Sequence, residues 1–244
     1  MAAMNKSTGT SYRVLARVAV VLLGLVSILG TGGGGGGGSS STTPTPTDIP
    51  FQLFPTGYFS NGYTRTWHLS GSDNVGDTFT ATWTETTQAQ TTYNGQPAIP
   101  VQSVLSLTNT QTQATDTVTG VDYYSIDPMS LMYYGWTDSL TNAFTLISLS
   151  IIPQSATIGT SAINPVGRYS GSGAAAGETE TDTWQLTNAN NGLANFVMIS
   201  STYSGSTLEE TDTTTYVIDQ QGNRQSVTVN VLDNTGVTVT LSGN

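Results

Sequence analysis

The 244-residue chain contains no cysteine and only one histidine, His68. Without cysteine there is no disulfide, no thiol nucleophile and no thiolate metal site. A single histidine without a Gly-x-Ser-x-Gly motif does not make a serine hydrolase, and it cannot supply the ligands of a zinc site. Lys6, the single lysine, lies in the N-terminal segment, which excludes Schiff-base chemistry and a P-loop. We therefore expect a non-enzymatic protein with no catalytic residue, no metal and no cofactor.

Positive charge is scarce beyond the N-terminal segment. From Asp48 onward the chain has three arginines against 16 acidic residues, a formal net charge of −13. Such a surface repels nucleic acid and anionic membranes. Only 9% of all residues are charged, so threonine, serine, asparagine and glutamine must cover most of the surface. This composition is typical of a secreted, periplasmic or cell-surface β-protein.

The N-terminal segment has the pattern of an export signal. A basic start is followed by an apolar run from Val18 to Leu29, shorter than the ~20 residues that span a bilayer. Residues 1–31 are predicted to be a signal peptide or, if uncleaved, an N-terminal membrane anchor. Residues 27–31 and the glycines after them resemble a bacterial lipoprotein signal, but Thr31 stands where that family has its lipidated cysteine. The resemblance implies export without a lipid anchor.

Residues 32–48 consist mostly of glycine, serine, threonine and proline, a composition that predicts a linker without a core of its own. A membrane would be contacted only through the segment before it. The partner of the folded part is an unidentified ligand or cell-surface component.

The rest of the chain contains an internal duplication. Residues 76–83 (GDTFTATW) recur 101 positions later as residues 177–184 (GETETDTW). Phe79, Ala81 and Trp83 alternate with threonines, and a period of two is the strand signal. No stretch beyond residue 48 has helical periodicity. We predict an all-β protein of two internally repeated antiparallel β-meanders, residues 49–153 and 154–244, packed as a sandwich or closed into a barrel.

The duplication places two acids at unusual positions. Glu180 and Asp182 occupy the face on which the first copy has Phe79 and Ala81, and Trp184 follows on that face. Two carboxylates beside an aromatic ring are the pattern of a glycosidase or of a site for a hard cation such as calcium. The simplest interpretation is a strand end that projects past the core into water. The turn Asp73–Asp77 also has residue types found in calcium loops, without the full spacing.

A second candidate site is an aromatic cluster that includes Tyr133, Tyr134 and Trp136. Exposed, these rings would form a stacking platform for a sugar or another flat ligand; buried, they would be core residues of a strand pair. Three functions remain open. The first is an exported binding or structural surface module, the second is a carrier of an apolar ligand in a β-sheet cavity, and the third is a carbohydrate-binding or carbohydrate-active protein.

Overall fold

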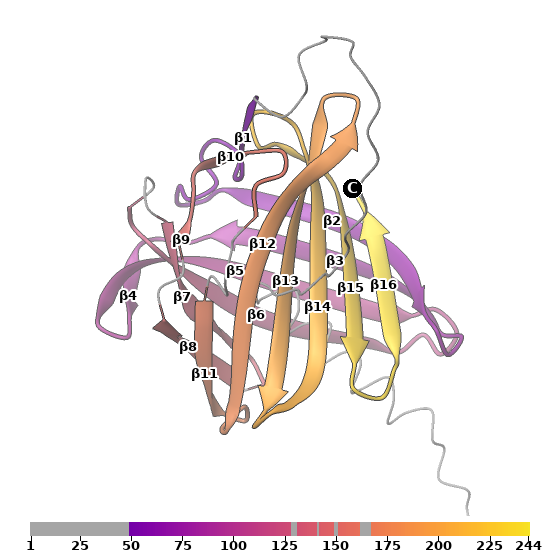
Figure 1. Ribbon diagram of the computed structural model, residues 1–244. Coiled ribbons are helices and arrows are strands. Elements are labelled where there is room, and N and C mark those ends of the chain that lie inside the picture. Colours follow the sequence, from indigo (N-terminus) through magenta and orange to yellow (C-terminus); the bar gives the residue numbers. More distant parts are fainter. Residues whose placement is uncertain (1–48, 128–130, 141, 149–150, 162–166) are drawn as a thin grey trace, which may run out of the picture.

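The computed structural model describes residues 49–127, 131–140, 142–148, 151–161 and 167–244 (Figure 1). The predicted signal segment 1–31 and linker 32–47 lie outside the described residues, as does Asp48. Every regular element among the described residues is a strand, which confirms the all-β class. The described residues include no helix long and apolar enough to cross a membrane.

The described part of the first half of the chain, residues 49–153, contains nine strands. Their bounds are β1 (Pro50–Gln52), β2 (Thr64–Asp73), β3 (Thr78–Thr87), β4 (Thr91–Tyr93), β5 (Gln96–Asn109), β6 (Thr115–Ser125), β7 (Leu131–Asp138), β8 (Asn142–Ser148) and β9 (Ile151–Ile152). The second half contains β10 (Ser155–Thr157), β11 (Gly167–Gly173), β12 (Glu178–Asn190), β13 (Leu193–Ser204), β14 (Thr207–Ile218), β15 (Arg224–Asp233) and β16 (Thr238–Gly243).

Twelve of these strands form a closed antiparallel barrel. Their order is β2-β3-β5-β6-β7-β8-β11-β12-β13-β14-β15-β16, and β16 pairs with β2 to close the ring. Each half contributes six strands in meander order, and the pairings β8–β11 and β16–β2 join the halves. The expected pair of antiparallel meanders is confirmed, and of the two expected arrangements the structure shows the barrel. In Figure 1, β12–β16 run steeply, while β2, β3, β5 and β6 cross the far wall at a shallow angle.

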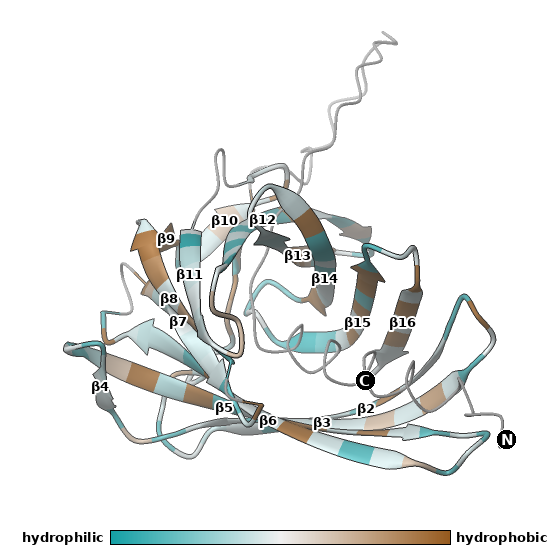
Figure 2. Cartoon of the chain, turned by 90° about the horizontal axis from the view of Figure 1, so that it is seen from below, coloured by the Kyte–Doolittle hydropathy of each residue, from teal (hydrophilic) through white to brown (hydrophobic). Residues whose placement is uncertain are grey.

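The alternation of side chains along each strand separates an apolar interior from a hydroxyl-rich exterior. On β3, Phe79, Ala81 and Trp83 are buried, whereas the intervening threonines face outward. Outer-face threonines on neighbouring strands hydrogen-bond to each other, as Thr66 and Thr84 do at 3.1 Å. Figure 2 looks along the barrel and shows apolar and polar residues alternating along its strands.

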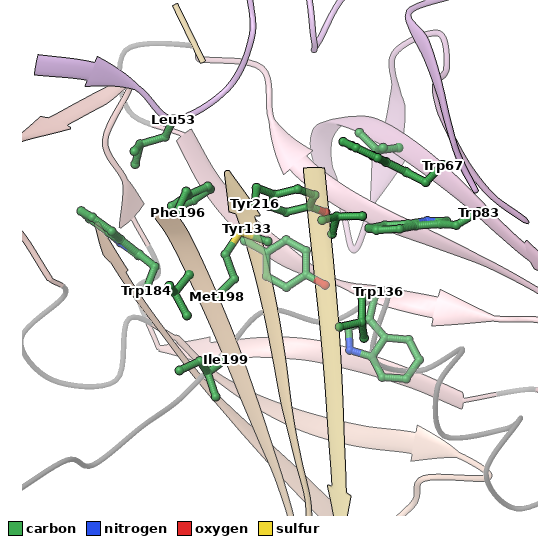
Figure 3. Close-up of a cluster of buried hydrophobic side chains, with 14 of the residues drawn as sticks. Leu53, Trp67, Trp83, Tyr133, Trp136, Trp184, Phe196, Met198, Ile199 and Tyr216 are labelled. Carbon is green, nitrogen blue, oxygen red and sulfur yellow. The ribbon is translucent and has the colours of Figure 1, made fainter. Parts of the chain in front are cut away.

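The largest buried side chains lie inside the barrel. The ring centroids of Trp67, Trp83 and Tyr216 lie 6.1–6.4 Å from each other and form one group, and the ring centroids of Trp184 and Phe196 lie 6.2 Å apart with their planes inclined at 64° (Figure 3). The two repeat tryptophans, Trp83 and Trp184, are therefore both core residues. These interior rings supply a large part of the buried apolar area, because each aromatic side chain buries a large apolar surface.

Residues 50–63 close the upper end of the barrel and are called the cap below. β1 of the cap pairs with β10, and the amides of Gln52 and Leu53 donate to the carbonyls of Gln220 and Gln154, each at 3.0 Å. Leu53 and Tyr58 are buried, which anchors the cap in the core. The cap therefore joins the first residues of the barrel domain to turns that lie more than 100 residues later.

Gly222 in the β14–β15 turn allows the cap to come this close. Its φ is +78°, and a Cβ there would lie 2.6 Å from the carbonyl oxygen of Phe54 and 2.8 Å from that of Gln52. Gly222→Ala is expected to lower the free energy of unfolding by about 1–3 kcal/mol, because it adds a backbone clash to a conformation that only glycine adopts freely.

Urea unfolding measures this loss, and Gly236→Ala is the matched control. Gly236 has a similar φ of +83° but open space around a Cβ. An equal loss of unfolding free energy in the two variants would show that the close approach of the cap to Gly222 does not add to the cost of the substitution.

Candidate functional site

Glu180 and Asp182 are buried inside the barrel, with exposed fractions of 1% and 2%. The interpretation that this strand end projects into water is therefore wrong. The physical reason is closure: β11 and β13 pair along both sides of β12, so that a residue on the face of Trp184 points into the interior. Glu210 and Asp212 on β14 are buried on the same interior wall.

The acid pair and part of the aromatic cluster meet, although they come from different halves of the chain. The indole Nε1 of Trp136 donates to both carboxylate oxygens of Glu180, at 3.2 and 3.3 Å. The hydroxyl of Tyr133 donates to Oδ1 of Asp122 at 2.6 Å. Both aromatic residues are fully buried, so this part of the cluster belongs to the core (Figure 3).

The other two candidate residues lie apart from this group. Tyr134 lies at a register shift between β6 and β7, where Tyr123 pairs with Gly135 but the next residue, Tyr124, pairs with Tyr133. Its side chain is half-buried on the outer side of the barrel. Trp184 packs against Phe196, whereas the rings of Tyr133 and Trp136 pack against those of Tyr124, Tyr169 and Phe144. The six predicted site residues therefore do not form one site.

Burial changes the protonation of the interior acids. It raises the pKa of Glu180 to about 8, although the donors on Trp136 and Ser200 oppose the shift. Burial and the nearby Glu180 also raise the pKa of Asp182 well above its ordinary value, and burial does the same for Asp122. Neither carboxylate oxygen of Asp182 has a hydrogen bond of good geometry; the hydroxyls of Tyr169 and Ser200 are the donors close enough to lower its pKa. Burial therefore shifts all three carboxyl groups toward the protonated form, and a pKa of about 8 leaves Glu180 mostly protonated at neutral pH.

The interior acids are poorly placed for either chemistry that their pattern suggested. A glycosidase acid must touch its substrate, and these side chains have almost no exposed surface. Within the described part of the chain, no group of three or more acidic or histidine side chains is arranged to hold a metal ion. The Asp73 turn has a different role, because Oδ1 of Asp73 accepts the backbone N–H groups of Val75, Gly76 and Asp77 at 2.8–3.0 Å.

An open pocket of about 720 Å³ lies between the cap and the upper rim of the barrel. Its volume is in the range of small-molecule sites. None of the described residues that line it carries a charge. The lining residues are Gln52, Phe54, Pro55, Thr56, Gly57, Tyr58, Phe59 and Ser60 of the cap, with Ile99, Ser125, Ile126, Leu131, Gln154, Gln220 and Gln221 of the rim.

The pocket combines aromatic faces with uncharged amides. The rings of Phe54 and Phe59 lie 5.0 Å apart, and both are half-buried. The side-chain amides of Gln52, Gln154 and Gln220 make no hydrogen bond to any described residue, and the same is true of Gln221. The pocket therefore offers flat apolar surfaces beside free donors and acceptors.

A buried ion pair holds the cap over the barrel. Nη1 of Arg224 lies 2.9 Å from Oε2 of Glu85, and the hydroxyl of Tyr58 donates to Oε1 of Glu85 at 2.9 Å. The Arg224 guanidinium also lies 4.6 Å from the ring centre of Tyr58 and 3.9 Å from that of Tyr216. Burial lowers the pKa of Arg224, but Tyr216 and Glu85 raise it to a net value well above the ordinary one, so the arginine stays charged.

Sequence reasoning did not find the pocket residues. Pro50 and Pro55 marked the cap as a loop or edge strand, and Gln220-Gln221-Gly222 marked a turn. Nothing local indicated that these segments meet. Comparison with known proteins found no matching family model, no matching curated protein and no matching solved structure.

Proposed function

We propose that the chain is an exported, non-enzymatic binding protein whose ligand occupies the pocket under the cap. The observation that carries the proposal is the pocket itself, with its two half-buried phenylalanines and four free glutamine amides. Concave sites with aromatic walls and a few convergent polar groups are the usual form of small-molecule sites.

The distribution of charge supports binding over catalysis. Among the described ionisable side chains whose pKa is raised, Tyr58 alone lines the pocket, and the buried acids Glu180 and Asp182 lie in the barrel interior. The hydroxyl of Tyr58 already donates to Glu85 and is held away from a ligand. A general acid or base must reach the reacting group, and none of these groups is placed to do so.

The compartment is part of the proposal. A signal-like N-terminus and an acidic, hydroxyl-rich exterior suit a protein that works in the periplasm, at the cell surface or in the medium. Outer-face threonines such as Thr80 and Thr82 present hydroxyl groups to water.

Phe59→Ala should weaken binding in this pocket by about tenfold, because it removes one of the two half-buried phenylalanine rings that line it. Ligand-observed NMR of the full chain against a chemically diverse fragment library measures this effect without assuming a ligand class. Thr82→Ala, on the outer face of β3, is the control and should bind every fragment that the parent binds. If the fragments that bind are unaffected by Phe59→Ala, the pocket is not the ligand site and the proposed function fails.

A further inference from the structure

We propose that the pocket binds an uncharged saccharide, with a sugar ring against Phe59 and Phe54 and its hydroxyls on the glutamine amides. This inference rests on the proposed function, because it names the ligand class of the same site. It uses a different set of residues from the acids and tyrosines that the sequence pointed to.

The polar part of the pocket matches hydroxyl groups. A glutamine amide offers two N–H donors and a carbonyl acceptor, and a sugar hydroxyl also donates and accepts. Four such amides line the pocket, together with the exposed hydroxyls of Thr56 and Ser60. A ligand with many hydroxyls satisfies these groups, whereas an apolar ligand would cover them and leave them without hydrogen bonds, which costs free energy.

The absence of charge among the lining residues argues against ionic ligands. An anion would find neither lysine nor arginine in the lining, and the rest of the chain from Asp48 onward carries a net charge of −13. A cation would find no carboxylate there. A neutral ligand is the class that needs no counter-charge on burial.

The aromatic part of the pocket suits the C–H face of a sugar. The Phe54 and Phe59 planes are inclined at 57°, and Phe59 rests on Tyr124 at 5.2 Å, which fixes its orientation. The face of an aromatic ring is the negative part of its quadrupole and attracts polarised C–H groups. Ile99 and Ile126 at the rim extend this surface.

The hydrogen bonds that hold the cap do not use the glutamine side chains, which can therefore bind a ligand. Gln154 and Gln220 hold the cap through their backbone carbonyls, so substitution of either by alanine keeps the anchoring hydrogen bonds. Gln154→Ala and Gln220→Ala therefore remove ligand contacts without removing the cap. Gln102→Ala, on the half-buried outer side of β5, is the matched control.

The test uses the full chain on a glycan array that displays neutral and acidic saccharides, followed by calorimetry with the neutral saccharide that binds most strongly. We expect binding to neutral saccharides only, weakened at least fivefold by Gln154→Ala or Gln220→Ala and unchanged by Gln102→Ala. Binding to acidic saccharides alone, or neutral-saccharide binding that neither glutamine substitution changes, would overturn the inference.

Fluorescence of 1-N-phenylnaphthylamine, an uncharged apolar dye, separates failure of the inference from failure of the proposed function. If no saccharide binds and the dye binds in a manner that depends on Phe59, the saccharide inference is wrong and the pocket remains a ligand site for an apolar molecule. If neither a saccharide nor the dye shows binding that depends on Phe59, the inference and the proposed function are both wrong.

Discussion

Arg224→Met is expected to lower the free energy of unfolding by about 3–5 kcal/mol, because it leaves the Glu85 carboxylate buried without its counter-charge. Glu85 would keep only neutral donors, the hydroxyl of Tyr58 and the indole of Trp67. Neutral hydrogen bonds offset part of the cost of burying a charge but not all of it. Urea unfolding followed by tryptophan fluorescence measures the loss.

The double variant Glu85→Gln/Arg224→Met tests the cause. Replacing both partners of a buried ion pair by uncharged side chains is far less damaging than removing one partner. The double variant should therefore recover much of the stability lost in Arg224→Met. Arg168→Met, at an exposed position on β11, should change the stability by less than about 0.5 kcal/mol. A double variant no more stable than Arg224→Met would show that the loss does not come from an uncompensated charge on Glu85.

Arg224→Met should also make the cap more mobile, so the ion pair affects the pocket as well as the stability of the barrel. Arg224 lies against Tyr58 at 4.6 Å and Phe54 at 5.8 Å, and both rings line the pocket. Hydrogen exchange at the backbone amides of Tyr58, Ser60 and Gly62, which are bonded in the folded cap, should be faster in Arg224→Met. The ion pair therefore supports the geometry of the proposed ligand site as well as the barrel.

The fold class could be predicted from the sequence because its signal is local. The alternation of Phe79, Ala81 and Trp83 with threonine gave both the strand and its buried face. Asn94-Gly95 is a dipeptide typical of hairpin turns, and both residues adopt the positive φ that such turns need. The choice between sandwich and barrel depends on the pairings β3–β5, β8–β11 and β16–β2, which no local pattern specifies.

The candidate site was less predictable because it, too, depends on contacts between residues far apart in the sequence. The alternation correctly placed Glu180 and Asp182 on the face of Trp184. Because charged residues are rarely buried in proteins, however, a strand end exposed to water was the simplest interpretation. The donor that makes burial of Glu180 tolerable, Trp136, lies 44 residues earlier and in the other half. The pocket depends on the cap reaching Gln154 and Gln220, and those contacts exist only in the folded chain.

Glu180→Gln should remove a loss of stability that the parent protein shows as the pH rises. Burial raises the pKa of Glu180 from 4.5 to about 8, so the folded state binds more protons than the unfolded state between these values. A carboxyl group of this kind contributes most at or below pH 4.5, and its contribution is lost as the pH rises to about 8. The loss is on the order of a few kcal/mol.

Glutamine keeps the size of the side chain and an oxygen that accepts from the Trp136 indole, but it carries no charge at any pH. The variant and the parent should therefore be similar near pH 5, and the variant should be more stable by a few kcal/mol at pH 9. Urea unfolding across this range measures the difference. Asp122 and Asp182, whose pKa values are also raised, will leave part of the slope in both proteins.

Asp116→Asn on β6, which removes a carboxylate from a partly exposed position instead of a buried one, is the matched control. A Glu180→Gln profile that coincides with the parent profile would mean that Glu180 is charged in the folded state at neutral pH. The donors on Trp136 and Ser200 would then outweigh burial, and the interior wall would carry negative charge rather than protons. The expected result would instead mean that Glu180 is an uncharged part of the barrel interior. The protein would then be most stable in mildly acidic solution and less stable in alkaline solution.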